Sequence, residues 1–157
     1  MRPKVDLCFY QLWDIEKIVR YNERIVPNPH PLDKYFGIDG HIVLKPGCKI
    51  TFQEKIRHKK YLRYHDLCIE YKSNKSGRKG EWFNLASDIY FLGFTNTDES
   101  NLLVWDVFDV LGIKEYVAEN WETLKQKIRY NSQHSSASFI PVPILDIPEW
   151  CIINSKI

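Results

Sequence analysis

The sequence predicts a single domain of the α/β or α+β class. With 157 residues, the chain suffices for one compact domain and hardly for two. Its 44% apolar and 27% charged residues are an ordinary globular composition. Segments with helical spacing and segments with strand alternation follow one another without an internal repeat or a linker. Their order is a helix, three or four strands, a mixed segment, a strand and a second helix, which favours a mixed architecture.

The first expected element is a helix from residue 6 to about residue 25. Asp6 is a suitable N-cap. The apolar residues that follow recur at helical spacing: Leu7, Leu12, Ile15, Ile18, Val19 and Ile25. Glu16, Arg20 and Glu23 would share one stripe of this helix. The segment 27–33 contains Pro27, Pro29 and Pro31, so we expect an extended loop there.

A pair of strands follows, joined by a turn. Residues 41–44 form a short apolar run, and Pro46-Gly47 is a turn signal. Residues 49–57 alternate, which predicts a strand with two different faces. One face carries Ile50, Phe52, Glu54 and Ile56, and the other carries Thr51, Gln53, Lys55 and Arg57.

The remaining elements are expected in the following order. Residues 66–72 alternate again and predict a strand, and 73–80 read as a polar loop. Residues 81–96 read as a helix that passes into a strand, and 101–108 as a strand. An amphipathic helix is expected over 112–130. The apolar, proline-containing segment that begins at residue 138 is expected to pack along an edge of the domain.

Several classes of protein are disfavoured by composition. No stretch approaches the roughly 20 apolar residues of a membrane span. The N-terminal segment has a basic start, but Asp6, Gln11 and Asp14 interrupt it, unlike a secretory signal. Four widely spaced cysteines without a CxxC pair argue against a disulfide framework and a zinc knuckle. We therefore expect reduced thiols and a cytoplasmic protein.

The charge is unevenly distributed. From Lys45 to Lys79 the chain has eleven Lys or Arg and three acids, which gives this segment +8. Because the whole chain carries +2, the remainder carries −6. A basic face on a nearly neutral protein suits binding to a phosphate backbone, since each neutralised phosphate releases counterions. The residues expected to contact DNA are Arg57, Lys59, Lys60, Arg63 and Lys72.

The hairpin predicted around Pro46-Gly47 brings chemically useful residues together. Asp39 enters the first strand, and Gln53 and Lys55 point the same way from the second. A carboxylate, an amide oxygen and an amine would therefore converge. Mg²⁺ prefers oxygen ligands and often takes only one or two protein carboxylates together with a substrate phosphate. A nearby lysine can orient the attacking water or stabilise charge on the phosphate.

These residues, in the pattern Asp39-(x)13-Gln53-Glu54-Lys55 after an N-terminal helix, resemble the PD-(D/E)xK, or restriction-endonuclease-like, nuclease superfamily. The resemblance implies a core of helix, three strands, helix and strand over about residues 6–108, built on a mixed sheet of four or five strands flanked by helices. The C-terminal helix and tail, 109–157, would complete the single domain 1–157. The resemblance also implies that Asp39 and Gln53 bind Mg²⁺ or Mn²⁺ and that Lys55 aids catalysis.

An acid on the first helix often joins such sites, and Glu16 or Glu23 would occupy that place; Glu16 is included in the candidate catalytic set. The segment that begins at Gly80-Glu81-Trp82 also resembles the region after the catalytic strand in phage-type members. The chain departs from the pattern at three positions. Ile38 replaces the proline, Gln53 replaces the second acid, and Glu54 occupies a position that is usually apolar.

Two alternative sets of ligands remain open at this stage. Glu54 either meets a basic partner near the sheet edge or, with a shifted register, is itself the ligand. A second ExK pattern, Glu70-Tyr71-Lys72 with Asp66 upstream, would be catalytic if the strands 49–57 and 66–72 formed the hairpin. The first set is preferred because its hairpin loop has a normal length.

The resulting expectation is a Mg²⁺-dependent nuclease that cleaves phosphodiester bonds, with DNA as the expected substrate and a homodimer as a possible form. The alternative is a catalytically inactive protein on the same fold that binds nucleic acid or a partner protein. A third possibility is an α+β accessory domain whose basic loop contacts acidic groups of another protein.

Overall fold

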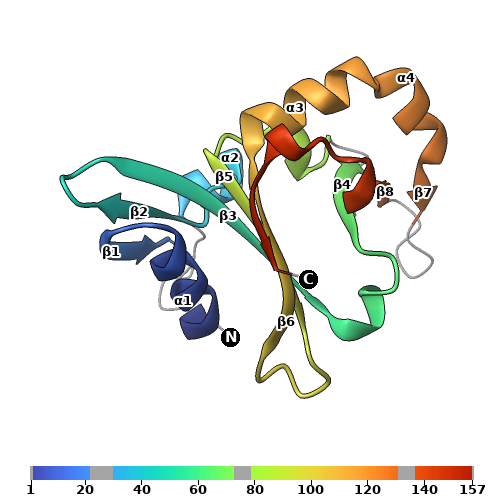
Figure 1. The fold of residues 1–157 in the computed structure, drawn as a ribbon. Helices are drawn as coiled ribbons and strands as arrows, with labels where there is room; N and C mark the ends of the chain where they lie inside the picture. Colours follow the sequence, from blue (N-terminus) through green and yellow to red (C-terminus); the bar gives the residue numbers. More distant parts are fainter. Residues whose placement is uncertain (1, 22–29, 73–78, 131–136, 157) are drawn as a thin grey trace.

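The computed structural model describes residues 2–21, 30–72, 79–130 and 137–156 (Figure 1). Its main feature is a six-stranded mixed sheet with the strand order β1-β2-β3-β5-β6-β9. β3 and β5 are parallel, and the other neighbours are antiparallel. The strands are β1 (Ile15–Arg20), β2 (Gly40–Leu44), β3 (Lys49–His58), β5 (Ile89–Thr95), β6 (Leu102–Asp109) and β9 (Ile152–Lys156). The mixed class is confirmed, and this sheet is larger than the four or five strands expected.

A second, antiparallel sheet has the order β4-β8-β7. Its strands are β4 (Asp66–Lys72), β8 (Ser138–Pro143) and β7 (Arg129–Tyr130). The four α-helices of the described residues are α1 (Arg2–Leu12), α2 (Pro31–Phe36), α3 (Val110–Glu119) and α4 (Trp121–Leu124). The described 3-10 helices are η1 (Lys59–Tyr61), η2 (Glu81–Phe83), η3 (Lys125–Lys127), η4 (Ile144–Asp146) and η5 (Glu149–Cys151). No helix within the described ranges is long and apolar enough to cross a membrane.

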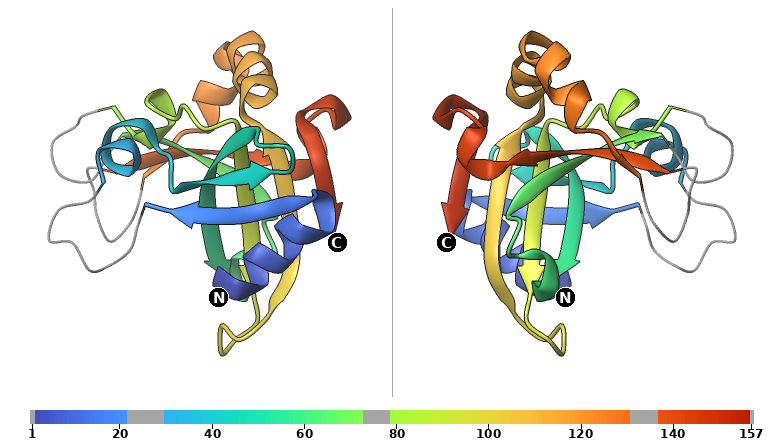
Figure 2. Two further views of the ribbon diagram at one scale, coloured as in Figure 1. Left: turned by 90° about the vertical axis from the view of Figure 1, so that its left-hand side faces the viewer. Right: turned by 90° about the vertical axis from the view of Figure 1, so that its right-hand side faces the viewer.

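Two apolar clusters lie on opposite faces of the large sheet. One cluster joins α1 to β2, β3, β5 and β6, and includes the fully buried Phe9, Phe52 and Phe91. The other joins β5 and β6 to α3 and to the small sheet, and includes Phe94 and Phe108. β5 and β6 are thus covered on both faces (Figure 2). As a result, all seven residues of β5 are buried.

The helix expected over residues 6–25 is wrong. α1 starts at Arg2, buries Val5, Cys8 and Phe9 at helical spacing, and ends at Leu12. Residues 15–20 then form β1, which is antiparallel to β2. Ile15, Ile18 and Val19 fit a helical spacing, but they are β-branched and belong to a sheet once β2 is beside them. The segment 22–29, with Glu23, Pro27 and Pro29, lies outside the described residues.

The two-stranded prediction around Pro46-Gly47 is confirmed. β2 and β3 pair from Gly40↔Phe52 to Val43↔Lys49. The turn between them is closed by the Leu44 amide, which donates to the Cys48 carbonyl at 2.8 Å. The expected strands at 66–72 and 101–108 correspond to β4 and β6. The segment 81–96, expected as a helix that passes into a strand, contains the 3-10 helix η2 followed by β5. Of the polar loop expected over 73–80, residues 73–78 lie outside the described residues.

The helix expected over 112–130 is shorter and starts earlier. Asp109 caps α3, since its Oδ1 accepts from the amides of Leu111 and Gly112 at 2.9 and 3.3 Å. α3 ends at Glu119, and the Asn120 side chain donates to the Tyr116 carbonyl at 2.8 Å. The chain then continues as α4, η3 and β7. The C-terminal segment supplies β8 and the edge strand β9, so it does pack along an edge.

One acidic side chain lies inside the large sheet. Asp106 on β6 has 0% exposure, and its Oδ2 lies 3.1 Å from Nε2 of the partly exposed His65. Its Oδ1 has no hydrogen-bond partner in the described part of the chain. The imidazole is therefore the side chain that compensates this buried carboxylate.

We predict that His65→Ala lowers the free energy of unfolding by about 2 kcal/mol or more, because a buried acceptor is left unpaired. Denaturant unfolding near neutral pH measures this change. The double variant His65→Ala/Asp106→Asn is expected to recover part of the loss, because a neutral amide replaces the buried acid. Wild-type stability of the single variant would contradict the assigned role.

Candidate active site

The site begins where β2 separates from β3. Asp39 directly precedes β2; its amide donates to the Phe52 carbonyl at 2.8 Å, and its carbonyl accepts from the Tyr21 amide at 2.7 Å. Its carboxylate Oδ2 accepts from the Glu54 amide at 2.7 Å. The Asp39 carboxylate thus accepts the hydrogen bond that a backbone carbonyl of β2 would accept if β2 continued alongside β3.

The glycine after Asp39 is required by the crowding at this point. A Cβ atom on Gly40 would lie 2.2 Å from the Val19 carbonyl oxygen and 2.7 Å from the Phe52 ring. β1, β2 and β3 can therefore approach one another here only if residue 40 has no side chain. The Asp-Gly pair combines this close approach with a carboxylate at the point where the strands separate.

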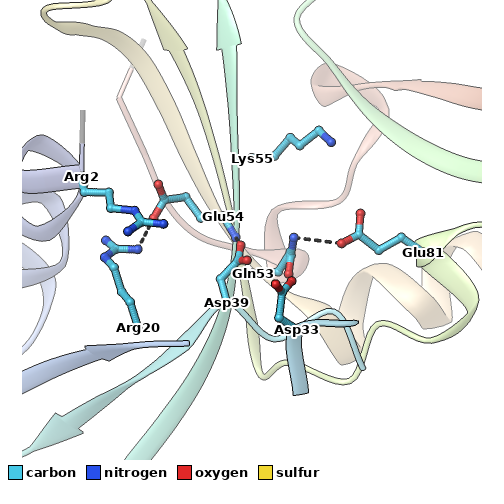
Figure 3. A pocket seen from close by; sticks show the side chains of 8 residues that line it. All are labelled: Arg2, Arg20, Asp33, Asp39, Gln53, Glu54, Lys55 and Glu81. Carbon is cyan, nitrogen blue, oxygen red and sulfur yellow. Dashed lines mark hydrogen bonds and ion pairs between the residues drawn. The ribbon is translucent and has the colours of Figure 1, made fainter. Parts of the chain in front are cut away.

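A polar cavity of about 310 Å³ opens at this place (Figure 3). It is lined by Arg2, Arg20, Asp33, Asp39, Gln53, Glu54, Lys55 and Glu81. Asp39, Gln53 and Lys55, which the sequence pattern singled out, therefore line one cavity. Figure 3 shows Asp39 at its centre, Arg2, Arg20 and Glu54 on one side, and Gln53, Lys55 and Glu81 on the other.

Gln53 is the most deeply buried polar residue of this cavity, with 5% exposure. Its Nε2 donates to Glu81 Oε1 at 3.0 Å, which fixes the orientation of the amide. Its Oε1 is buried and accepts no hydrogen bond from the described residues. Since a buried polar atom without a partner is costly, this oxygen is a place where a ligand would be stabilising.

The carboxylates around Gln53 have altered proton affinities. Burial raises the pKa of Glu81, as do the charges of Glu70, Asp39 and Asp33, whereas Lys55 lowers it. Burial also raises the pKa of Asp33, and so does the charge of Asp39. His30 acts in the opposite direction and lowers this pKa. A cation entering the cavity would relieve this mutual repulsion of carboxylates.

Glu54 points to the other face of β3, as the alternation predicted. Its carboxylate pairs with the Arg20 guanidinium, which also pairs with Asp6 of α1. Glu54 and Arg20 are only 12% and 11% exposed. Of the two alternatives, the structure shows the one in which Glu54 meets a basic partner, although β3 is an inner strand and Glu54 lies just past its pairing with β2. Arg20 holds α1 and β3 together at the edge of the cavity.

Glu16 is not in the cavity. It lies exposed on β1, because this segment is a strand rather than part of a helix. The expectation that a first-helix acid at Glu16 joins the site is therefore wrong on structural grounds, and Glu23 lies outside the described residues. Arg20, four residues further on, lines the cavity instead.

The alternative acids Asp66 and Glu70 do not form a site together. That alternative required β3 to pair with β4, but the two strands belong to different sheets. Asp66 is 7% exposed and its carboxylate pairs with Arg57. Glu70 faces a small neighbouring cavity together with Lys55 and Glu81.

The basic residues expected to contact DNA fall into two groups. Arg57 is only 15% exposed, its guanidinium donates to Asp66, and the same group lies 5.0 Å from the Tyr61 ring centroid. It is therefore not a freely exposed cation, and its contact with DNA stays a prediction. The other four, Lys59, Lys60, Arg63 and Lys72, are exposed. The first three lie in and just after η1, at the far end of β3.

Sequence reasoning missed four residues of the cavity: Arg2, Arg20, Asp33 and Glu81. For Asp33 a signal existed. Pro31 lies at the start of α2 and Gly37 ends it with a φ of 57°, which is the usual asymmetry of a short helix. The extended loop expected over 27–33 is therefore wrong from Pro31 onward. Arg20 and Glu81 are brought to Glu54 and Gln53 only by packing, across 34 and 28 residues of sequence.

Within the described ranges, no three His, Cys, Asp or Glu side chains form a group that could hold a metal ion. A metal here would rest on Asp39 and the amide oxygen of Gln53, with water or a bound phosphate completing its shell. Comparisons with protein-family models, curated proteins and solved structures give no significant match. The arguments for function therefore come from the sequence and the geometry.

We predict that Arg20→Ala lowers the free energy of unfolding by about 3 kcal/mol at neutral pH, because the buried Glu54 loses its partner. Burial raises the pKa of Glu54, and Arg20 opposes that rise. Without Arg20, folded Glu54 keeps its proton above the ordinary value of 4.5, where the unfolded chain releases it. The stability of the variant should therefore fall as pH rises from about 4.5 toward neutrality.

Denaturant unfolding at several pH values measures this dependence. Lys45→Ala is the control, because Lys45 forms an exposed pair with Asp14 and its loss should cost less than about 0.5 kcal/mol. A deficit of Arg20→Ala that stays constant from pH 4.5 to neutrality would refute the assignment.

Proposed function

We propose that the protein is a Mg²⁺-dependent or Mn²⁺-dependent nuclease that hydrolyses phosphodiester bonds in DNA. The observation that carries this proposal is the buried amide oxygen of Gln53, which has no hydrogen-bond partner among the described residues and lies in one cavity with Asp39 and Lys55. Oxygen donors suit a hard divalent cation, and a neighbouring amine suits a phosphate bound to that cation.

The order of elements supports a restriction-endonuclease-like core. α1 is followed by β1, then by the short helix α2, and then by β2 and β3. β1, β2 and β3 are antiparallel neighbours, and the chain then crosses to β5, which is parallel to β3. The PD-(D/E)xK resemblance implies helix, three strands, helix and strand, and the first helix, the three strands and the later parallel strand agree with that order. Within the described residues the crossover contains β4 and η2, where that pattern has a helix.

The residues of the cavity fit a divalent cation. Asp39 would supply a carboxylate oxygen and Gln53 its amide oxygen, while Glu81 keeps that amide turned by accepting its Nε2 hydrogen. When bound, Mg²⁺ polarises the phosphate and lowers the pKa of a water molecule. Lys55 extends from the same face of β3 as Gln53 and would orient the attacking water or offset charge on the phosphate.

The exposed basic residues support DNA as the substrate. The exposed cations come after the end of β3: Lys59 and Lys60 in η1, and Arg63 just beyond it. Gln53 lies about 17 Å from the end of β3 at the usual rise per residue. A phosphate backbone crossing the end of β3 would meet these three cations while another phosphate lies at the cavity.

A catalytically inactive nucleic-acid-binding protein is the second candidate. It is favoured by the amide at position 53, because a neutral oxygen binds a cation more weakly than a carboxylate. The two candidates share the basic surface and differ only in the reaction, so a cleavage assay separates them.

We predict that plasmid or linear DNA is cut in Mg²⁺ or Mn²⁺ and left intact in EDTA. Asp39→Asn should abolish cleavage while it keeps an oxygen for the Glu54 amide, and Lys55→Ala should slow it about 100-fold. Glu16→Gln is the matched control and should cut at the wild-type rate, since Glu16 lies outside the cavity. Equal inertness of wild type and Asp39→Asn would favour the inactive binder.

We also predict that replacing Lys59, Lys60 and Arg63 by Ala reduces the salt dependence of DNA binding. The slope of log K against log salt should become shallower by roughly two to three, because up to three phosphate contacts are lost. Replacement of Lys17, Lys125 and Lys127 removes the same charge elsewhere and should change the slope little. Fluorescence anisotropy in EDTA measures both, and identical slopes would exclude this segment from the interface.

A further inference from the structure

A second pocket, separate from the candidate active site, is lined by aromatic side chains from three elements. Tyr71 of β4 has its ring centroid 5.8 Å from that of Phe83 and 5.8 Å from that of Trp121. The interplanar angles are 59° and 43°, so the rings do not stack on one another. Phe83 is 39% exposed, and the cavity measures about 210 Å³. Ring surface is therefore accessible from solvent.

Two cations border these rings. The cavity is lined by Lys72 and Lys79 as well as by the three aromatic residues. Both lysines are exposed, and Lys79 Nζ lies 5.6 Å from the Phe83 ring centroid. Among the residues that line this cavity in the described part of the chain there is no acid. The pocket thus offers apolar ring faces in its wall and positive charge at its border.

The pocket is adjacent to the candidate active site. A small cavity that contains Lys55, Glu70, Glu81 and Trp82 shares Lys55 and Glu81 with the active-site cavity. Glu70 and Trp82 are the chain neighbours of Tyr71 and Phe83, which line the aromatic pocket. The two segments are joined by the Gly80 amide, which donates to the Tyr71 carbonyl at 3.0 Å.

The close approach of these segments fixes the wall between the two cavities. A Cβ atom on Gly80 would lie 1.9 Å from the Glu70 carbonyl oxygen, so η2 begins directly against β4. Glu81 can therefore reach Gln53 while Phe83, two residues on, faces Tyr71. One short segment contributes to both sites.

We infer that this pocket binds an unpaired nucleobase of single-stranded DNA next to the scissile phosphate. A base stacks on accessible aromatic rings whatever its sequence, and its flanking phosphates are anions that Lys72 and Lys79 complement. The small volume accommodates a single ring system rather than a drug-sized ligand or a helix. An apolar protein side chain would use the rings but would leave the two lysines without a function.

The position of the base relative to the reaction rests on the proposed nuclease function, whereas the binding itself does not. Single-stranded DNA binding is therefore measured in EDTA, where no cleavage is expected. The probe is a fluorescein-labelled oligothymidylate, compared with a blunt duplex of equal length. The wild-type protein should bind the single strand more tightly than the duplex.

Phe83→Ala and Phe83→Leu should each weaken single-strand binding about tenfold, because one stacking surface is lost. Duplex binding should stay unchanged. Leu keeps apolar volume at residue 83, so Phe83→Leu tests stacking even if the alanine variant folds poorly. Tyr10→Ala is the control, since Tyr10 is 51% exposed on α1, away from this pocket. Photo-crosslinking with 5-iododeoxyuridine should label Tyr71, Phe83 or Trp121.

Wild-type affinity of Phe83→Leu for the oligothymidylate, or crosslinks confined to other residues, would overturn the inference. Its failure can be distinguished from failure of the nuclease proposal. DNA cleavage that depends on Asp39, together with normal binding by Phe83→Leu, would leave the nuclease and remove the base pocket. An inert wild-type protein whose single-strand binding requires Phe83 would do the reverse.

Discussion

The hydrogen bond from the Glu54 amide to the Asp39 carboxylate lies where β2 leaves β3, and the arrangement of the candidate site depends on it. A backbone amide left without a partner at this point would be costly, so a side-chain acceptor has to take over from the strand. Gly40 permits the close approach of three strands that brings this acceptor within reach. The carboxylate is thereby fixed in the lining of the cavity by a backbone hydrogen bond.

Alternation along β3 then distributes the remaining groups to two faces. Gln53 and Lys55 extend to the side where Glu81 lies, whereas Glu54 extends to the side of Arg20 and α1. Each buried polar group on these faces is compensated by a distant segment, with the exception of the Gln53 amide oxygen among the described residues. That exception is what makes a bound cation physically reasonable at this position.

The local patterns predicted the hairpin but failed at the N-terminus. The turn at Pro46-Gly47 and the alternation of 49–57 depend on neighbours in the sequence, and both correspond to observed elements. Residues 15–20 have apolar positions that suit a helix and a strand equally well. The partner strand β2 decides between them, and its paired residues are 20 to 29 positions away in the sequence. Because residues 15–20 form a strand, Glu16 lies on β1 and outside the cavity.

The sequence by itself determined the mixed class, the hairpin, and the common orientation of Gln53 and Lys55, because period-two alternation needs no long-range information. It also determined the concentration of positive charge between residues 45 and 79. Only the tertiary structure decided three pairings. Arg20 forms an ion pair with Glu54, Glu81 accepts a hydrogen bond from Gln53, and Arg57 forms an ion pair with Asp66. The physical reason is that each of these partners is selected by burial between elements distant in the chain, which no local pattern encodes.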